Sequence, residues 1–513
     1  MTRGIRQSPC CLWKARPVQA AFFAALLWGL TAQGMGLLNK YSSNDDIFQL
    51  FGTGSTITSG RWMLFVLEQA ENLLWGGHCS LPLFNGFLSL VFIGTSAGLI
   101  ASLLRIHRPL PGALLGAVMA SFPTVTSIFS FMFTAHFYFL ALFMITACAY
   151  LVCTGTSWKA RVSGIVLGAC AVGIYQAFLP VLPTVILLSG LRELSAGETK
   201  PSFLFRKLVL QAAAVALVLL LYLAGSRFFL WKYGMQLDSY MGINQAGTTS
   251  PLVYLQRAGK AYLEFFRPTR SVSWDMYPHR AHLLYLLMLC ANGVMAAVLV
   301  FQTGQKNRGS AALMLLLLLL FPLGCNLIFV MSETVHGLMV YGQVLQAALL
   351  ILLTDWLAFS LPVSKRMVSG AAALLLTGMC VVYARYDNQC YLKADFQKQE
   401  AISWNTALVA QIKSTEGYRD ELPVAWVNRY SAEDRSLYRI LELDELHLSG
   451  YESSLQEYIN NFAWEKFLAC WCGFSPDTVD PEAVAHLPEV EQMPSYPEDG
   501  SVRVLDGIVV VKF

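Results

Sequence analysis

The sequence predicts a polytopic α-helical membrane protein with about eleven transmembrane helices, followed by a small α/β domain. Of the 513 residues, 55% are hydrophobic and 13% are charged, whereas a soluble domain carries about 25% charged residues. The charges are also unevenly placed. Residues 1–386 hold 26 of the 36 basic residues but only 11 of the 33 acidic ones. We therefore expect a basic membrane domain (1–386) and an acidic domain (387–513).

Apolar stretches of the first domain give the predicted spans. They are residues 18–38, 82–104, 110–128, 131–152, 162–178, 180–191, 207–230, 281–301, 310–330, 337–358 and 367–386. The sixth is short, and Pro180 and Pro183 interrupt the apolar run there. The fifth and sixth spans are therefore predicted to form a tight hairpin of short helices. One long kinked helix is the alternative, and it would invert every later span.

The distribution of basic residues favours the hairpin and sets the orientation. With it, one side receives every basic short segment: residues 3–16, 105–108, 159–161, 192–207, 306–308 and 365–366. The opposite short connections near 128–131, 178–180 and 331–336 carry no Lys or Arg. By the positive-inside rule the N-terminus is cytoplasmic. Segments 39–81 and 231–280 and the acidic domain are then extracytoplasmic.

The acidic domain contains no apolar run of span length. Helix-like segments at 397–412 and 455–468 are mixed with strand-like segments at 423–428 and 502–511. This pattern is typical of a small α/β unit. No basic patch with interleaved aromatic residues occurs in either domain, so nucleic acid is not an expected partner.

Two adjacent carboxylates, in the run Asn44-Asp45-Asp46, directly follow the first span. Acids held together at a membrane surface are costly unless they bind, coordinate or abstract something. A plainer interpretation is a solvated loop in which Asn44 or Asp45 caps a short helix. The predicted orientation places both acids outside the membrane, at the mouth of the first helix.

Both long external segments contain a predicted surface helix, at residues 61–75 and 251–266. The first begins with Arg61, which either binds phosphate or pairs with Glu68 or an Asp. The second segment is basic through Lys232, Arg257, Lys260, Arg267 and Arg270. These residues either anchor the loop to anionic headgroups or capture a lipid-linked phosphate.

Other external polar residues have two interpretations each. Tyr175 and Gln176 either line a sugar pocket or form a hydrogen bond between helices. Glu333 and His336 either contact a sugar or transfer a proton, or they belong to a solvated turn. His136 lies inside the fourth span, where a polar side chain needs a partner, and we expect a structural hydrogen bond.

These features match the needs of an enzyme that moves a sugar from a lipid phosphate to an external hydroxyl. Asp45 or Asp46 supplies a base for the acceptor proton. The Arg61 and Arg257–Arg270 cations, or a divalent metal (Mg²⁺ or Mn²⁺) at Asp46, would stabilise the departing phosphate. No nucleotide-binding motif occurs, as expected for a donor that is charged elsewhere.

Short motifs resemble the GtrII-type membrane glucosyltransferases, enzymes of the GT-C architecture. They are Asn44-Asp45-Asp46, Ser59-Gly60-Arg61-Trp62, Gly173-Ile174-Tyr175-Gln176 and the ending from Met493-Pro494-Ser495-Tyr496-Pro497 to Val511-Lys512-Phe513. The resemblance implies a bacterial inner-membrane enzyme that transfers glucose from polyprenyl-phosphate-glucose to a surface glycan such as O-antigen, with inversion. It also implies a donor-synthesising glycosyltransferase and a flippase as partners.

The family's base is an acidic residue in the first external loop, which corresponds here to Asp45 or Asp46. We favour Asp45 as base, with Asp46 positioning an acceptor hydroxyl or a metal. A transporter or flippase of lipid-linked sugars is the alternative. It predicts ionisable residues at mid-membrane and two related halves, whereas this sequence has few mid-span charges and no such repeat.

Overall fold

The computed structural model describes residues 13–54, 56–197, 199–238, 250–266, 279–360, 365–429, 446 and 462–513. The chain divides into two compact units. The first comprises residues 1–40 and 51–388, and the second comprises residues 41–50 and 389–513.

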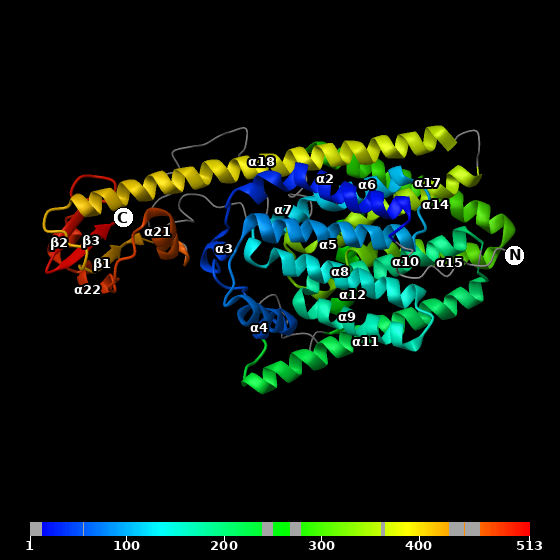
Figure 1. Ribbon diagram of the computed structural model, residues 1–513, viewed down its shortest axis with the longest axis horizontal. Helices are drawn as coiled ribbons and strands as arrows, with labels where there is room; N and C mark the ends of the chain where they lie inside the picture. Colours follow the sequence, from blue (N-terminus) through cyan, green and yellow to red (C-terminus); the bar gives the residue numbers. More distant parts are fainter. Residues whose placement is uncertain are drawn as a thin grey trace. The chain divides into compact units, whose positions relative to one another are not determined.

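The described residues of the first unit form helices joined by loops, with no strand among them (Figure 1). Its longer helices are α2 (Arg16–Leu38), α4 (Trp62–Trp75), α5 (Pro82–Leu103), α6 (Pro109–Ser121), α8 (Met132–Thr154), α9 (Trp158–Ile174), α10 (Val181–Ser195), α11 (Pro201–Tyr233), α12 (Pro251–Phe266), α14 (His279–Lys306), α15 (Arg308–Cys325), α17 (Leu345–Ser360) and α18 (Lys365–Ser414), the last of which continues into the second unit. Short helices are α7 (Pro123–Phe129), α16 (Ile328–Met331), η1 (Ile57–Ser59), η2 (Gln176–Phe178), η4 (Gly337–Met339) and η5 (Tyr341–Val344).

Neighbouring helices in the sequence mostly pack side by side. In Figure 1, α2, α5 and α8 lie in succession, and α2 also contacts α6. The chain continues through α8 against α9 and α9 against α11, while α14 packs between α15 and α17. Since these helices are apolar on most faces, their packing rather than a single amphipathic stripe defines the bundle.

Each predicted span falls on a helix, but the count of eleven stays a prediction. Eight helices of the described part are long and apolar enough to cross a membrane, or nine if the bent pair α6–α7 is one span. That pair bends by 41° at Phe122, which precedes Pro123 and has an extended backbone. The shorter helices are α9, with 17 residues, and the segment Tyr341–Leu357.

The break between the fifth and sixth spans is where the sequence prediction was wrong in detail. The chain leaves helical geometry at Tyr175, which has φ −151° and ψ 105°, and not at the prolines. Pro180 and Pro183 instead occupy the start of α10, where proline costs a helix least because those N–H groups have no partner in the helix. Two separate helices result, and the later one belongs to the candidate span Gln176–Ser195.

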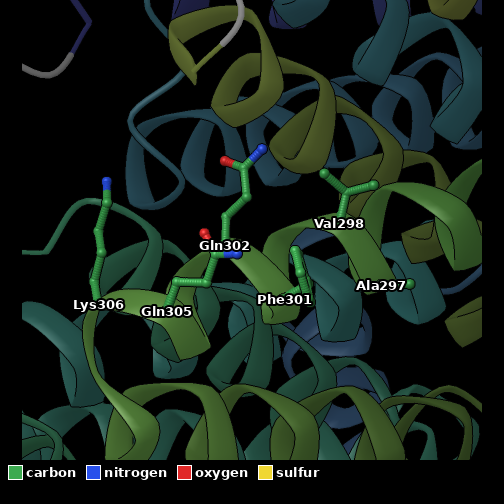
Figure 2. Close-up of a pocket in the computed structure, with 6 residues that line it drawn as sticks. All are labelled: Ala297, Val298, Phe301, Gln302, Gln305 and Lys306. Carbon is green, nitrogen blue, oxygen red and sulfur yellow. The ribbon is translucent and has the colours of Figure 1, made fainter.

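A shallow pocket of about 470 Å³ lies at the end of α14 that is predicted to be cytoplasmic. Figure 2 shows that its lining residues follow one another along this single helix. They are Ala297, Val298, Phe301, Gln302, Gln305 and Lys306. None of the residues predicted for catalysis or binding lines this pocket.

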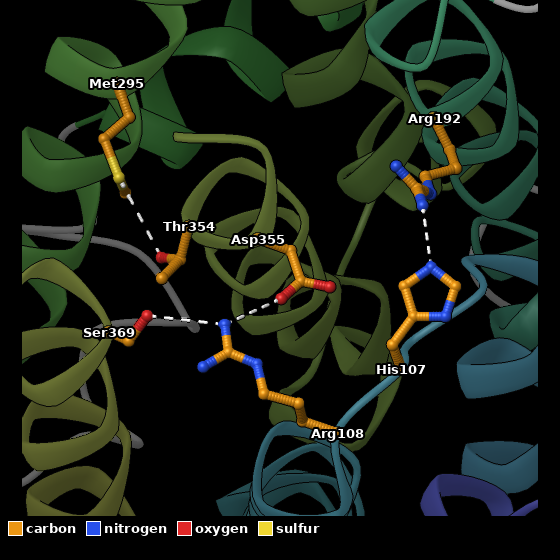
Figure 3. A network of polar contacts seen from close by, with 7 residues as sticks. All are labelled: His107, Arg108, Arg192, Met295, Thr354, Asp355 and Ser369. Carbon is orange, nitrogen blue, oxygen red and sulfur yellow. Dashed lines mark hydrogen bonds and ion pairs between the residues drawn. The ribbon is translucent and has the colours of Figure 1, made fainter. Parts of the chain in front are cut away.

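A polar network joins the loop before α6 to three other helices (Figure 3). Arg108 Nη2 lies 3.2 Å from Asp355 of α17 and 3.5 Å from Ser369 of α18. In the same view Arg192 of α10 reaches His107, 3.4 Å away. Because Arg108 is half exposed, its ion pair contributes at most about 1 kcal/mol to stability. The network therefore contributes little to the stability of the bundle. It lies where the basic residues Arg108 and Arg192 come together.

The second unit combines the end of α18 with a small sheet. Its elements are α3 (Asn44–Phe48), β1 (Val424–Val427), α21 (Trp464–Cys472), α22 (Glu482–Ala485), α23 (Pro488–Glu491), β2 (Val502–Leu505) and β3 (Ile508–Lys512). The strand order is β1-β3-β2, with β1 parallel and β2 antiparallel to β3. The predicted strand-like segment at 423–428 contains β1, whereas the predicted segment at 502–511 forms two antiparallel strands, β2 and β3. The predicted helix at 455–468 begins at Trp464 within the described residues, and residues 455–461 lie outside them.

Both faces of this sheet are covered. Val509 and Val511 of β3 point into a large apolar cluster that includes Leu408 of α18 and Trp464 of α21. Val510, which points the other way, belongs to a smaller cluster with Val490 and Met493. Alternate residues of a strand face opposite sides of the sheet, so this short strand contributes to two separate cores.

Candidate functional site

The side chain of Trp62 brings two of the sequence motifs together. A Cβ atom at Gly173 of α9 would lie 2.7 Å from its indole ring, and a Cβ at Gly225 of α11 would lie equally close. The ring therefore fits between α9 and α11 only because both positions are glycine. This close packing fixes the start of α4, where Arg61 is the N-cap residue.

The guanidinium of Arg61 lies on two stacked tyrosines. The rings of Tyr138 and Tyr175 are 3.9 Å apart and nearly parallel, at 8°. Arg61 Cζ is 5.6 Å from the first ring centroid and 5.9 Å from the second, within cation–π range. Arg61 Nη1 also donates a 2.8 Å hydrogen bond to the Tyr138 hydroxyl.

Gln176 completes this arrangement from the side. Its Nε2 atom donates to the Ser59 carbonyl at 2.9 Å and to the Tyr222 hydroxyl at 3.1 Å. Gly60, which follows Ser59, has φ 77°. A Cβ atom at this position would overlap the Tyr222 hydroxyl oxygen. We call Arg61, Tyr138, Tyr175, Gln176 and Tyr222 the Arg61 cluster. It presents a cation on an aromatic platform, which suits an anion such as phosphate.

A second polar cluster lies at the other end of α4. Glu71 Oε2 is 2.5 Å from His78 Nδ1, and Glu71 Oε1 is 3.4 Å from Nε2 of His136 on α8. The two imidazole rings are parallel within 9°, with centroids 6.0 Å apart. His136 thus has the partner that the sequence predicted it to need. We call these three residues the Glu71 cluster.

The protonation of the Glu71 cluster follows from its geometry. Burial would raise the pKa of Glu71, but the hydrogen bonds from His136 and His78 outweigh it and lower the pKa to about 2. An ionised carboxylate only accepts, so His78 Nδ1 and His136 Nε2 must both carry protons. The opposite ring nitrogens, His78 Nε2 and His136 Nδ1, are buried and have no hydrogen-bond partner among the described residues.

The predicted catalytic carboxylates lie in α3, within the second unit. Ser43 caps this helix through a 3.3 Å bond from the Asp46 N–H to its side chain, so the cap is neither Asn44 nor Asp45. Asn44 is half-buried, Asp45 is exposed and Asp46 is fully buried. Asp45 is therefore the carboxylate with access to solvent.

The remaining predicted residues are spread over the first unit. Tyr175 donates a 3.2 Å hydrogen bond to the Leu338 carbonyl, which ties the Arg61 cluster to the turn that carries exposed Glu333 and half-buried His336. Arg257 and Lys260 lie on α12, where Lys260 Nζ is 5.9 Å from the Phe329 ring centroid. Arg267 and Arg270 lie outside the described residues.

Sequence reasoning missed Tyr138 and Tyr222, which complete the Arg61 cluster. Both lie within apolar spans, on α8 and α11. A hydroxyl inside a span needs a partner, so this was the available signal, as it was for His136. Within the described part of the chain, no three His, Cys, Asp or Glu side chains are grouped to hold a metal ion, and the metal at Asp46 stays a prediction.

The model of the family described as glucosyl transferase GtrII matches residues 34–347, which is more than half of the chain. The chain belongs to this family. No curated protein and no solved structure matches it. The GtrII match contains α3 and every member of both clusters, and it ends before α18 and the sheet of the second unit. A GtrII glucosyltransferase requires a sugar donor and a glycan acceptor.

Proposed function

We propose that this GtrII-family protein transfers glucose from a polyprenyl-phosphate-linked donor to a surface glycan, on the extracytoplasmic face of the bacterial inner membrane. The Arg61 cluster carries this proposal. It joins two motifs more than 100 residues apart around a guanidinium, within the segment that the family model matches. A phosphate ester is the ligand such a planar cation suits best.

The proposed reaction is a single displacement. Asp45 takes the proton of the acceptor hydroxyl, whose oxygen attacks the anomeric carbon from the face opposite the phosphate. The bond from that carbon to the phosphate oxygen breaks, and the lipid phosphate leaves with the electron pair. The configuration at the anomeric carbon is therefore inverted. The exposure of Asp45 supports its choice as base, because a base must reach the proton that it abstracts.

The other residues take supporting roles in this proposal. Arg61 stabilises the departing phosphate, and the basic residues of the second external segment, Arg257, Lys260, Arg267 and Arg270, bind the phosphate or neighbouring headgroups. In this proposal the sugar is bound by Tyr175, Gln176, Glu333 and His336, and the acceptor by Asn44.

Transfer of labelled glucose in proteoliposomes tests the proposal. The wild-type protein, given polyprenyl-phosphate-glucose and a cell-envelope glycan, should form labelled glycan. Asp45→Asn should lose about 10²-fold or more in rate, the contribution expected of a general base. Full activity in this variant would exclude Asp45 as base, and the same assay on Asp46→Asn would then test the second carboxylate. Failure of the wild type with every polyprenyl-phosphate sugar, combined with movement of the lipid across the bilayer, would favour a flippase.

A further inference from the structure

The second unit contains a piece of the first external segment. Residues 41–50 belong to the same compact unit as residues 389–513, although more than 300 residues separate them in the sequence. The GtrII match includes the first piece and ends before the second. The described C-terminal residues thus share a compact unit with a segment that the family model matches, although they lie beyond the matched range themselves.

Apolar contacts hold α3 in this unit. Ile47 is 2% exposed and belongs to the large cluster on one face of the sheet, together with Leu408 and Trp464. The next residue, Phe48, meets Phe462 edge-to-face with ring centroids 5.2 Å apart. A helix of five residues is not stable alone, so these contacts rather than its own hydrogen bonds maintain it.

Polar contacts fix both ends of the same segment. Lys466 Nζ of α21 donates a 2.9 Å hydrogen bond to the Phe48 carbonyl, at the C-terminal end of α3. Before α3, the Tyr41 hydroxyl donates to Asp395 of α18 at 3.3 Å, and the Tyr41 ring stacks on Tyr391 at 6.1 Å. Two different helices of the second unit, α18 and α21, therefore hold this segment.

This packing decides which carboxylate faces outward. Asp46 and Ile47 are buried, whereas Asp45 and Phe48 are exposed. Residues three apart share a face of a helix, so Asp45 and Phe48 lie together on the open face. A rotation of α3 about its axis would exchange the positions of Asp45 and Asp46.

We propose that the C-terminal tail, residues 389–513, is a positioning domain that holds α3 and aims Asp45 at the acceptor hydroxyl. This inference rests on the proposed function, because it gives the orientation of Asp45 a catalytic consequence. Ile47, Lys466 and Tyr41 are then positioning residues that act through α3. The inference also gives a role to the acidic domain, which lies beyond the range that the family model matches.

Two matched cavity variants test the inference. Ile47→Ala removes three side-chain heavy atoms from the cluster that holds α3. Met493→Ala removes the same number from the cluster on the opposite face of the sheet, which does not include α3. Both variants are made in the full-length protein, and their tails are compared by resistance to proteolysis, so that loss of the whole domain is recognised.

Glucosyl transfer and hydrogen exchange are measured for both variants. Ile47→Ala should lower kcat by about 10- to 100-fold, as expected for a misplaced catalytic group, with the KM for the lipid-linked donor little changed. Exchange in the peptide covering residues 41–50 should become faster. Met493→Ala should leave kcat, and the rate of exchange in the peptide covering residues 41–50, close to the wild-type values. Rescue is expected from Ile47→Val, which retains most of the buried side chain.

The possible outcomes separate the two proposals. Equal losses of kcat in both variants, or unchanged exchange at residues 41–50 in Ile47→Ala, would overturn the positioning role while leaving glucosyl transfer established. An inactive wild type would overturn the proposed function and the catalytic part of this inference together. In that case, the exchange data would still show whether the tail holds α3.

Discussion

The hydroxyl of Tyr138 accepts a 2.8 Å hydrogen bond from the guanidinium of Arg61. This bond joins the N-terminus of α4, in the segment 39–81 that is predicted to be external, to α8 of the bundle. At the other end of α4, Glu71 reaches His136 on the same helix, two residues before Tyr138. Helix α4 is thus attached to α8 at both of its ends, and Arg61 is held in a defined place.

We predict that Arg61→Lys lowers kcat/KM for the lipid-linked donor by about 10- to 100-fold, since a hydrogen bond to a charged group is worth about 1.5–3 kcal/mol. Lysine keeps the charge but lacks the planar fork that stacks on Tyr138 and Tyr175. Tyr138→Phe is the matched variant, because it removes the hydroxyl and retains the ring. It should lose less activity than Arg61→Lys. Wild-type kcat/KM in Arg61→Lys would contradict a phosphate-binding role.

Gly173→Ala should destabilise the protein and reduce transfer. Its added Cβ would lie 2.7 Å from the Trp62 ring, and overpacking of this kind costs about 1–3 kcal/mol. Displacement of Trp62 would also move the adjacent Arg61. Thermal unfolding in detergent and glucosyl transfer are the two measurements.

Gly293→Ala is the control for this substitution. Gly293 also lies within a helix, α14, but a Cβ there has no neighbour within 4 Å. Alanine at this position should stabilise the helix by up to about 1 kcal/mol, with activity unchanged. Equal effects of the two substitutions would mean that helix propensity, and not contact with Trp62, explains the result.

The membrane class, the tail's strands and the surface helices could be predicted because each depends on local pattern. The helix at 251–266 and the strand at 424–427 need only the periodicity of their own residues. The break at Tyr175 was misplaced for the same reason. Prolines predict a break locally, but Pro180 and Pro183 are tolerated at a helix start, while the extended backbone of Tyr175 accompanies its contacts with Arg61 and Leu338.

The candidate site could be predicted only in part, because its members come together through long-range packing. Arg61, Tyr175 and Gln176 were identified from motifs, but nothing in the sequence pairs them with Tyr138 or Tyr222. The association of Ile47 with Trp464 joins residues far apart in the chain, and no local pattern reports such a contact. Periodicity gives the face that a helix buries, not the partner against which it is buried.

Glu71 should make stability depend on pH in the acid range. Its folded-state pKa of about 2 is lower than its ordinary value of 4.5. The ionised carboxylate therefore stabilises the folded protein fully above pH 4.5, and this contribution is lost as the pH falls from 4.5 towards 2. Glu71→Gln should unfold at a lower temperature than wild type at neutral pH. Below pH 4.5 its melting temperature should change less with pH than that of the wild type.

The control for this prediction is Glu333→Gln, which changes an exposed carboxylate in a turn. This variant should have the wild-type melting temperature at neutral pH, and its melting temperature should fall with decreasing pH as steeply as that of the wild type. Melting curves for the three proteins, recorded in one detergent at several pH values, make the comparison. An unchanged acid slope in Glu71→Gln would show that the histidine contacts of Glu71 do not stabilise the fold.

The predicted orientation can be tested with cysteines of the chain itself. Cys79, in the first predicted external segment, and Cys470, in the C-terminal domain, are both exposed, whereas Cys325 is buried. A maleimide that cannot cross membranes, added to cells with a permeable outer envelope, should modify Cys79 and Cys470 and spare Cys325. Lys306→Cys supplies a matched exposed thiol at the end of α14 that the positive-inside rule places in the cytoplasm. It should react only after the membrane is broken, and mass spectrometry identifies each site. Labelling of Lys306→Cys in intact cells, with protection of Cys79, would invert the topology and place the proposed base on the side opposite the surface glycan.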